Sequence, residues 1–403
     1  MKILQLCNKI PYPEKDGGAL GVSVFSNSLV KAGCQVKMLA MNTKKHHIDL
    51  NKIPKSFLSL TNLEAVEVDT TVRLSSALAA LVQGKSYNIS RFNSKAYRQK
   101  LIELLTKEKF DIIQLEGLYL TPYIDTIRQL SDAPIILRAS NVEWKIWNSL
   151  GEKESNFIKK IYIRKLAKQL HKFERSVLNQ CDGVITFTKT DLTELKNMGC
   201  EASLAHIPFG IDISKYNALL PAKDQKSLFY IGALDWLPNL QGVNWFIDNV
   251  WEKISAALPG INLHIAGRNM PNEMKKRLVK GITFHGEVDE VFTYIQQYNL
   301  MIVPLLAGSG IRVKIIEGMA LGRPIITTLV GIEGIECNYG SDVLVENTAD
   351  EFAKAIRKCI EDSAFTNQLA ENGRKFAIEH HDIDKITQNL IQFYKERIKQ
   401  TGK

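Results

Sequence analysis

The segment 304–335 combines groups that could bind a phosphorylated ligand. It reads PLLAGSGIRVKIIEGMALGRPIITTLVGIEGI. An apolar strand leads into the small-residue loop 307–310, and a short helix that carries Arg312, Lys314 and Glu317 follows. The first N–H groups of a helix lack intrahelical partners and the helix dipole adds to their field, so such a loop can hold phosphate. Two cations and a carboxylate beside it indicate a ligand with phosphates and hydroxyl groups, as in a nucleotide-sugar.

Short apolar strands alternate with helical stretches along the whole chain. We expect strands in the first half at 2–6, 36–40, 111–115, 134–138 and 183–187, and in the second half at 227–231, 261–266, 282–285, 300–303, 324–328 and 342–345. Val/Ile/Leu-rich runs between helices are typical of parallel strands that are buried on both faces. The pattern predicts an α/β protein with two doubly wound, Rossmann-like parallel sheets.

A segment without helical period separates the two halves. Residues 206–223 contain two prolines and a glycine, which suits a linker. We therefore expect an N-terminal domain at 1–205 and a C-terminal domain at 224–382. The sequence leaves open which domain the final helix in 383–403 contacts, and we expect the N-terminal one. Because ligands of open α/β sheets bind at the carboxyl ends of the strands, we also expect an interdomain cleft.

The composition limits the class of protein. The chain has 403 residues, of which 45% are hydrophobic and 24% charged, as in a soluble protein of about two domains. No apolar run approaches the roughly 18 residues of a membrane span, and the first residues are too weakly apolar for a signal peptide. The six cysteines are scattered without a CxxC pair, which argues against a zinc ribbon or a disulfide framework. We expect a cytoplasmic protein.

The net charge of +9 is concentrated in one segment. Residues 151–176 contain eight Lys/Arg and three Glu, a net charge of +5. Within 158–178 an apolar helical face is expected at Ile158, Tyr162, Leu166, Leu170, Phe173 and Val177. One interpretation is a packed helix with a solvated basic side. The other is docking to anionic lipid at the inner face of the cytoplasmic membrane.

Five stretches, in order, resemble the GT-B-fold, GT4-type retaining glycosyltransferases, in particular those of bacterial surface-polysaccharide synthesis. They are PYPEKDGGAL at 11–20, HIPFGIDISKY at 206–216, FYIGALDWLPNLQGVNWF at 229–246, IAGRNMP at 265–271 and GSGIRVKIIEGMALGRPIITT at 308–328. The resemblance covers nearly the whole chain. It implies a nucleotide-sugar donor held mainly by the C-terminal domain, a saccharide or lipid-linked acceptor on the N-terminal domain, and no metal or other cofactor.

The resemblance gives roles to the three side chains of the first motif. Glu317 matches a glutamate that accepts hydrogen bonds from the ribose hydroxyls, and a carboxylate suits vicinal hydroxyls because it only accepts. Arg312 and Lys314 would neutralise a diphosphate whose negative charge grows as the glycosidic bond breaks. The alternative for Lys314 and Glu317 is an ordinary i, i+3 ion pair on a solvated helix.

Further donor contacts are expected around these side chains. The amides of Ser309, Gly310 and Ile311 would contact the phosphates. Arg268 ends a strand on the same side of the sheet, and the base would stack over the segment that ends at Val288.

The chain departs from the pattern of the family at three of these places. Relatives often have a glutamate where this chain has Ser309, and many have an arginine and a lysine where it has Asp235 and Asn239. These differences leave the phosphates to Arg312 and Lys314 and leave the sugar undefined. Ser309 can also serve as the N-cap of the helix that follows.

The N-terminal half offers candidates for acceptor or sugar contact. Gly17 and Gly18 open the first helix, and two glycines allow a ligand to approach the backbone, although a plain turn is the alternative. Relatives tend to have a histidine where Ser140 stands. Asn141 and Glu143 remain as candidates in that loop, with a purely structural role as the alternative.

The function that this sequence favours is the transfer of a sugar, with retention, from a nucleoside-diphosphate sugar. One alternative is a nucleotide-sugar epimerase of the same fold, which would need acid and base groups beside the sugar that the sequence does not show. The other is a basic nucleic-acid-binding protein, prompted by the pI near 9.0. The chain lacks basic strands interleaved with aromatic residues and lacks a recognition helix, so we expect no nucleic-acid partner.

Overall fold

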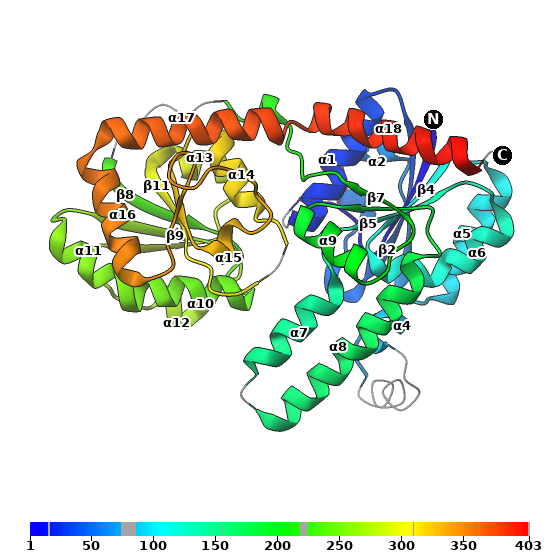
Figure 1. Cartoon of the computed structure of the whole chain (residues 1–403), viewed down its shortest axis with the longest axis horizontal. Coiled ribbons are helices and arrows are strands. Elements are labelled where there is room, and N and C mark those ends of the chain that lie inside the picture. Colours follow the sequence, from blue (N-terminus) through cyan, green and yellow to red (C-terminus); the bar gives the residue numbers. More distant parts are fainter. Residues whose placement is uncertain (15–16, 74–85, 155, 218–223, 309, 402–403) are drawn as a thin grey trace. The chain divides into compact units, whose positions relative to one another are not determined.

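The computed structural model describes residues 1–403 except 15–16, 74–85, 155, 218–223, 309, 402–403 and the side chains of Lys153 and Asp224. The chain divides into two compact units (Figure 1). The first contains Met1–Gly210 and Ile383–Lys403, and the second contains Ile211–Asp382. Ile207 and Phe209 are buried in the first unit. The chain passes into the second unit after Gly210, a few residues after the expected start of the linker at 206.

The first unit is built on a parallel sheet in the order β3-β2-β1-β4-β5-β6-β7. Its strands are β1 (Lys2–Cys7), β2 (Gln35–Thr43), β3 (Glu64–Val68), β4 (Ile112–Glu116), β5 (Ile135–Ala139), β6 (Gly183–Thr186) and β7 (Ser203–His206). Its helices are α1 (Gly17–Lys31), α2 (Lys55–Thr61), α4 (Tyr87–Ser90), α5 (Lys95–Lys107), α6 (Ile124–Leu130), α7 (Glu143–Lys153), α8 (Phe157–Leu178), α9 (Lys189–Asn197) and α18 (Ile383–Thr401). Strands β3 and β7 were not predicted.

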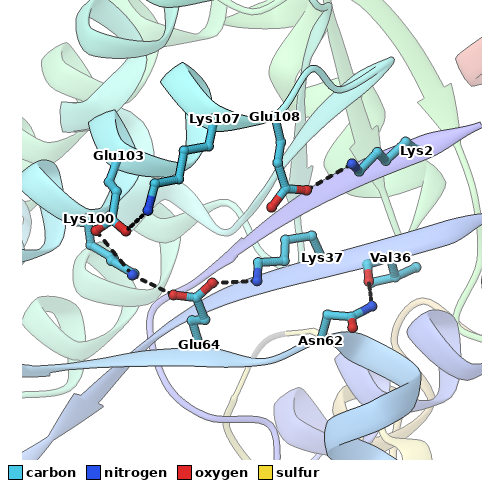
Figure 2. Close-up of polar contacts among 9 residues, drawn as sticks. All are labelled: Lys2, Val36, Lys37, Asn62, Glu64, Lys100, Glu103, Lys107 and Glu108. Atoms are coloured by element: carbon cyan, nitrogen blue, oxygen red, sulfur yellow. Dashed lines mark hydrogen bonds and ion pairs between the residues drawn. The ribbon is translucent and has the colours of Figure 1, made fainter.

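A chain of charged side chains holds the edge strand β3 to its neighbours. Figure 2 shows Glu64 of β3 between Lys37 of β2 and Lys100 of α5, with Lys100 Nζ 2.6 Å from the Glu64 carboxylate. Lys100 also pairs with Glu103 at 3.2 Å, and Glu103 pairs with Lys107 at 2.7 Å. Charged residues are common on edge strands because they oppose pairing with other chains. The glutamates of β3 also interrupt the apolar run by which a strand is predicted from sequence.

The C-terminal helix α18 packs on the first unit, along α1 (Figure 1). Leu390 and Tyr394 are fully buried in the same core cluster as Phe25 of α1. A Cβ on Gly183 at the start of β6 would lie 2.8 Å from the ring of Phe393. The helix therefore completes the core of the unit from which the chain departs at Gly210.

Helices α7 and α8 form an antiparallel hairpin in the first unit (Figure 1). Leu166, Leu170 and Val177 of α8 are buried, in agreement with the predicted apolar face. Ile158 was also assigned to that face, and this prediction was wrong, because its side chain is 79% exposed. Helical periodicity alone does not show whether a neighbouring element covers the first turn of α8.

The second unit has a parallel sheet in the order β10-β9-β8-β11-β12-β13. The strands are β8 (Asp224–Ile231), β9 (Asn262–Ala266), β10 (Ile282–Gly286), β11 (Tyr298–Val303), β12 (Ile325–Thr327) and β13 (Leu344–Val345). The helices are α10 (Leu237–Phe246), α11 (Glu252–Ala257), α12 (Asn272–Lys275), α13 (Val291–Gln297), α14 (Val313–Ala320), α15 (Leu329–Ile332), α16 (Ala349–Glu361) and α17 (Ser363–His380), with a π-helical turn at Ile247–Trp251. Each of the six strands predicted in this half is present, and the prediction of two Rossmann-like sheets is confirmed.

Candidate functional site

The motif of the second half lies at the carboxyl end of β11. Strand β8 pairs with β9 on one side and with β11 on the other, so the strand order reverses between β8 and β11. Ligands of open α/β sheets bind outside the carboxyl ends of the strands at such a switch point. Helix α14 begins at Val313 with Arg312 in the N-cap position. The expectation that Ser309 caps this helix was therefore wrong, and Ser309 itself lies outside the described residues.

Lys314 extends from the first turn of α14 toward β8. Its Nζ donates hydrogen bonds to the hydroxyl of Tyr230, at 3.1 Å, and to Oδ1 of Asn239, at 3.3 Å. Tyr230 belongs to β8 and Asn239 to the first turn of α10, so one ammonium group joins three elements. The Asn239 amide is fixed in turn, because its Nδ2 donates to the Ala233 carbonyl at 2.7 Å. Lys314 is thus half-buried among polar partners, unlike a solvated surface cation.

The surroundings of Lys314 lower the pKa of its side-chain amine. Burial and, to a smaller extent, the neighbouring Arg312 guanidinium lower the pKa of Lys314 to about 7, although the Glu317 carboxylate opposes the change. Near neutral pH the amine therefore exchanges readily between its charged and neutral forms. An anion bound beside it would favour the charged form.

Two glycines bring the backbone close to the Lys314 ammonium. A Cβ on Gly232, just after β8, would clash with Lys314 Nζ and lie 2.8 Å from the Tyr230 hydroxyl. A Cβ on Gly267, just after β9, would clash with the carbonyl oxygen of Gly232. The absence of side chains at both positions lets Gly232 lie against Lys314 and lets the ends of β8 and β9 approach each other.

Arg312 folds back on its own loop. Its guanidinium donates to the carbonyls of Gly310 and Val330, at 3.3 Å for the latter, and lies 5.9 Å from the ring of Trp236. The side chain is only 5% exposed, and burial lowers its pKa from the usual value. Gly310 has a φ of 79°, in the left-handed region that favours glycine. Arg312 therefore holds the loop before α14 through the Gly310 carbonyl and places a positive charge next to this loop.

Glu317 lies one turn further along α14. It contacts Tyr216, which lies near the start of the second unit. The hydroxyl of Tyr216 donates a 2.8 Å hydrogen bond to Oε1 of Glu317. Arg374 of α17 donates to the Tyr216 carbonyl at 2.8 Å, and the Phe292 ring stands edge-on to the Tyr216 ring at 5.3 Å. Sequence reasoning missed Tyr216 as a partner of this carboxylate, although the residue ends one of the five stretches that resemble the family.

The loops after β9 and β10 continue this edge of the sheet. Arg268 lies 4.0 Å from Asp235, and Asn269 donates to the same carboxylate at 2.9 Å. Because Gly267 N–H donates to the Gly286 carbonyl at 2.7 Å, the two loops are tied together. Val288 follows Gly286 closely and is half-buried. Ile311 is half-buried in the loop before α14.

The candidates of the first unit differ in their surroundings. Gly17 and Gly18 are exposed and form the first two residues of α1. Asn141 is half-buried in the loop before α7, where its Nδ2 lies 3.5 Å from Ser140 Oγ. Glu143 accepts a 2.9 Å hydrogen bond from the Tyr119 hydroxyl, and burial raises the pKa of its carboxyl.

Glu174 is a buried carboxyl group of this region that sequence reasoning missed. It projects from α8 and accepts hydrogen bonds from the backbone N–H groups of Glu143 and Trp144, each at 3.1 Å. Burial raises the pKa of Glu174 to about 8, despite these two donors. The side chain closes the N-terminus of α7 and so fixes the position of Glu143.

The described part of the chain contains neither a metal-ligand cluster nor a membrane-spanning helix. Among those residues, no group of three or more His, Cys, Asp or Glu side chains is arranged to hold a metal ion. No helix in the same residues is both long enough and apolar enough to cross a membrane.

Comparison with known proteins agrees with this fold. The chain superimposes on the sucrose-phosphate synthase of Thermosynechococcus elongatus with a TM-score of 0.73 and 15% identity, covering 98% of this chain and 99% of that one. It superimposes on HepE of Anabaena, solved in complex with UDP-glucose, with a TM-score of 0.66 and 15% identity, covering 98% and 100%. The fold is GT-B, with two Rossmann-like units.

Sequence comparisons place the second unit in a family. Residues 225–362 match the family model "Glycosyl transferases group 1". An "Uncharacterized 44.6 kDa protein in cps region" of Klebsiella pneumoniae is 24% identical over 409 residues, covering 97% of this chain and 99% of that protein. The second unit is a group 1 glycosyltransferase domain, and the chain is a glycosyltransferase.

Proposed function

We propose that this glycosyltransferase moves a sugar, with retention, from a nucleoside-diphosphate sugar to a saccharide or lipid-linked acceptor in the synthesis of a surface polysaccharide. The donor class is supported by the HepE structures, which contain UDP and UDP-glucose. The setting is supported by the relative described as a protein of a cps region. Retention rests on the resemblance to GT4-type enzymes.

The observation that carries this proposal is the convergence of Arg312, Lys314 and Glu317 at the switch point of the second sheet. The diphosphate binds at Lys314 and at the amides of Gly310 and Ile311, while Arg312 supplies a fixed charge beneath the loop. The ribose hydroxyls donate to Glu317, since a carboxylate can accept several hydrogen bonds at once. The base lies over the segment that ends at Val288, and Arg268 stands beside it.

Lys314 contributes to the chemical step through its charge. Cleavage of the glycosidic bond adds negative charge to the departing diphosphate, so a cation already in place stabilises the transition state more than the ground state. Tyr230 and Asn239 hold the ammonium before the donor arrives. This arrangement avoids reorganisation during the reaction. The attack of the acceptor from the face of the leaving group is an expectation from the family.

The acceptor binds to the first unit in this proposal. Gly17 and Gly18 offer exposed backbone at the start of α1, and Asn141 offers an amide in the loop after β5. Glu143 is half-buried and accepts the Tyr119 hydrogen bond. We assign it a role in shaping this loop, with contact to the sugar left to Asn141.

A thermal-shift panel tests the donor class. We expect one nucleoside diphosphate and its sugar conjugates to raise the melting temperature, because a ligand that binds only the native state stabilises it. The bound nucleotide-sugar is then incubated without acceptor and with saccharide or lipid-linked acceptors, and the products are followed by NMR. Transfer with an unchanged anomeric configuration supports the proposal. An epimerised donor in the absence of acceptor would instead establish the epimerase, and an inverted product would refute retention.

A further inference from the structure

The hairpin of α7 and α8 carries apolar side chains that its own packing does not cover. At the end where α7 stops and α8 starts, Leu150 is 45% exposed, Phe157 74%, Ile158 79% and Ile161 52%. Two close contacts hold the two helices together at this end. A Cβ on Gly151 would lie 3.2 Å from side-chain atoms of α8, and Lys160 Nζ donates to the Glu152 carbonyl at 3.3 Å. The apolar end is therefore part of a packed hairpin.

The helical spacing links these apolar residues to a row of cations. One exposed stripe of α8 consists of Ile158, Ile161, Lys165, Lys168, Lys172 and Arg175. The spacings of 3, 4, 3, 4 and 3 keep the six residues on one face. The opposite face is occupied, because Leu166, Leu170 and Val177 are buried in the unit. The stripe therefore begins with apolar side chains at the end of the hairpin and continues with cations toward the sheet.

The charge of α8 is unbalanced on its solvent side. The helix contains seven Lys/Arg and one acidic residue, Glu174. That carboxyl group is buried and bonded to the backbone of α7, so it does not offset the exposed cations. A partner for this surface must accept apolar side chains at one end and offer dense negative charge along the rest.

We propose that the end of the α7–α8 hairpin docks on an anionic lipid surface. Phe157, Ile158 and Ile161 enter the boundary between head groups and acyl chains, and the cations of the stripe lie against the charged head groups. A second copy of the chain is a poorer partner, because two such stripes would bring cations together. The inference builds on the proposed lipid-linked acceptor, yet its test does not depend on sugar transfer.

Vesicle flotation tests the proposal with the full chain. We expect the protein to float with phosphatidylglycerol-rich vesicles and to stay behind with pure phosphatidylcholine vesicles. The variant F157S/I158S/I161S should lose at least tenfold in binding, and so should K165E/K168E/K172E, while high salt should weaken the wild type. L278S is the matched control, since Leu278 is 99% exposed in the other unit. It should bind like the wild type.

Two further measurements keep the outcome clear. All variants should retain the melting temperature and the nucleoside-diphosphate shift of the wild type, since the substituted side chains are exposed. The proposal would be overturned if the wild type and the two triple variants bound the vesicles equally. It would also be overturned if the wild type bound phosphatidylcholine and phosphatidylglycerol-rich vesicles equally. If sedimentation showed a dimer that F157S/I158S/I161S converts to a monomer, with no vesicle binding, the surface would be an interface between copies and the proposal would be wrong.

Discussion

The hydroxyl of Tyr216 donates a 2.8 Å hydrogen bond to Oε1 of Glu317, and the two residues are 101 positions apart in the chain. Tyr216 is itself held, because Arg374 donates to its carbonyl and its side chain is 5% exposed. A carboxylate that accepts a hydrogen bond from a fixed phenol is held in a defined orientation. We infer that Tyr216 positions Glu317 for the ribose hydroxyls of the donor.

Replacing Tyr216 by Phe should weaken donor binding without stopping catalysis. A hydrogen bond to a charged group contributes about 1.5–3 kcal/mol. Losing the Tyr216 bond should affect both the orientation of Glu317 and the stability of the unit. We expect Tyr216→Phe to raise the donor KM about three- to tenfold and to change kcat by less than about twofold. Steady-state kinetics with varied donor measures both. Tyr339→Phe, at a 54% exposed tyrosine of the same unit, is the control. An unchanged KM would remove Tyr216 from the site.

Lys314 should make nucleotide binding depend on pH. Its pKa in the folded protein is about 7, below the usual 10.5, so the folded state holds fewer protons than the unfolded state between these values. Stability should therefore rise with pH across this window, by at most about 1.4 kcal/mol per unit. A bound diphosphate favours the ammonium form, so binding should take up a proton near pH 8 and weaken as the pH rises further.

Calorimetry in buffers of different ionisation enthalpy measures this proton uptake. The Lys314→Met variant should bind the nucleoside diphosphate at least tenfold more weakly and take up less proton than the wild type. Lys275→Met, on α12 of the same unit, removes an exposed lysine and should behave like the wild type. If the wild type bound the nucleotide without proton uptake, the proposed role of Lys314 would have to be abandoned.

Glu174 should make the stability of the first unit fall with pH. Burial raises its pKa from 4.5 to about 8, so the folded state holds more protons than the unfolded state between these values. Stability from this group is fully present below pH 4.5 and is lost as the pH rises through 8. Urea unfolding at pH 5 and pH 8.5 should show Glu174→Gln gaining about 1 kcal/mol or more relative to the wild type. A difference that does not change with pH would contradict the assignment.

Removing one side chain of α18 should destabilise the first unit alone. Leu390 is fully buried against α1 and β6, and Leu→Ala changes in cores cost about 2–5 kcal/mol. We expect Leu390→Ala to lower the unfolding midpoint of this unit, while nucleoside-diphosphate affinity at low temperature stays within about twofold of the wild type. Leu130→Ala, at a 42% exposed leucine of the same unit, should change neither. Loss of nucleotide affinity in folded Leu390→Ala would show that the units are coupled.

The sequence predicted the two sheets because most strands are continuous apolar runs, which alternate with helices. It did not predict β3, whose sequence EAVEV places Glu64 at the start of an edge strand. The partners of that glutamate, Lys37 and Lys100, come from distant positions. Nor did it predict β7, whose four residues include Ser203 and His206. Short or charged edge strands depend on tertiary contacts that periodicity does not record.

The spacing of Arg312, Lys314 and Glu317 located the candidate site on α14, because loop, helix and cations are close in sequence. Their partners could not be found in this way. Tyr230 and Asn239 are 84 and 75 positions from Lys314. The sheet order brings them to the same edge. The low pKa of Lys314 likewise follows from burial, a property of the folded unit.

Glu317 is proposed to bind the ribose of a nucleoside-diphosphate donor. The most direct test of this role compares a nucleoside diphosphate with its 2′,3′-dideoxy analogue, titrated into the wild type and into Glu317→Ala. We expect the wild type to prefer the ribose form at least tenfold, since each charge-assisted hydrogen bond contributes about 1.5–3 kcal/mol. Glu317→Ala should bind both forms equally and weakly. If the wild type bound both forms equally, or if Glu317→Ala still preferred the ribose form, Glu317 would not be the ribose-binding residue.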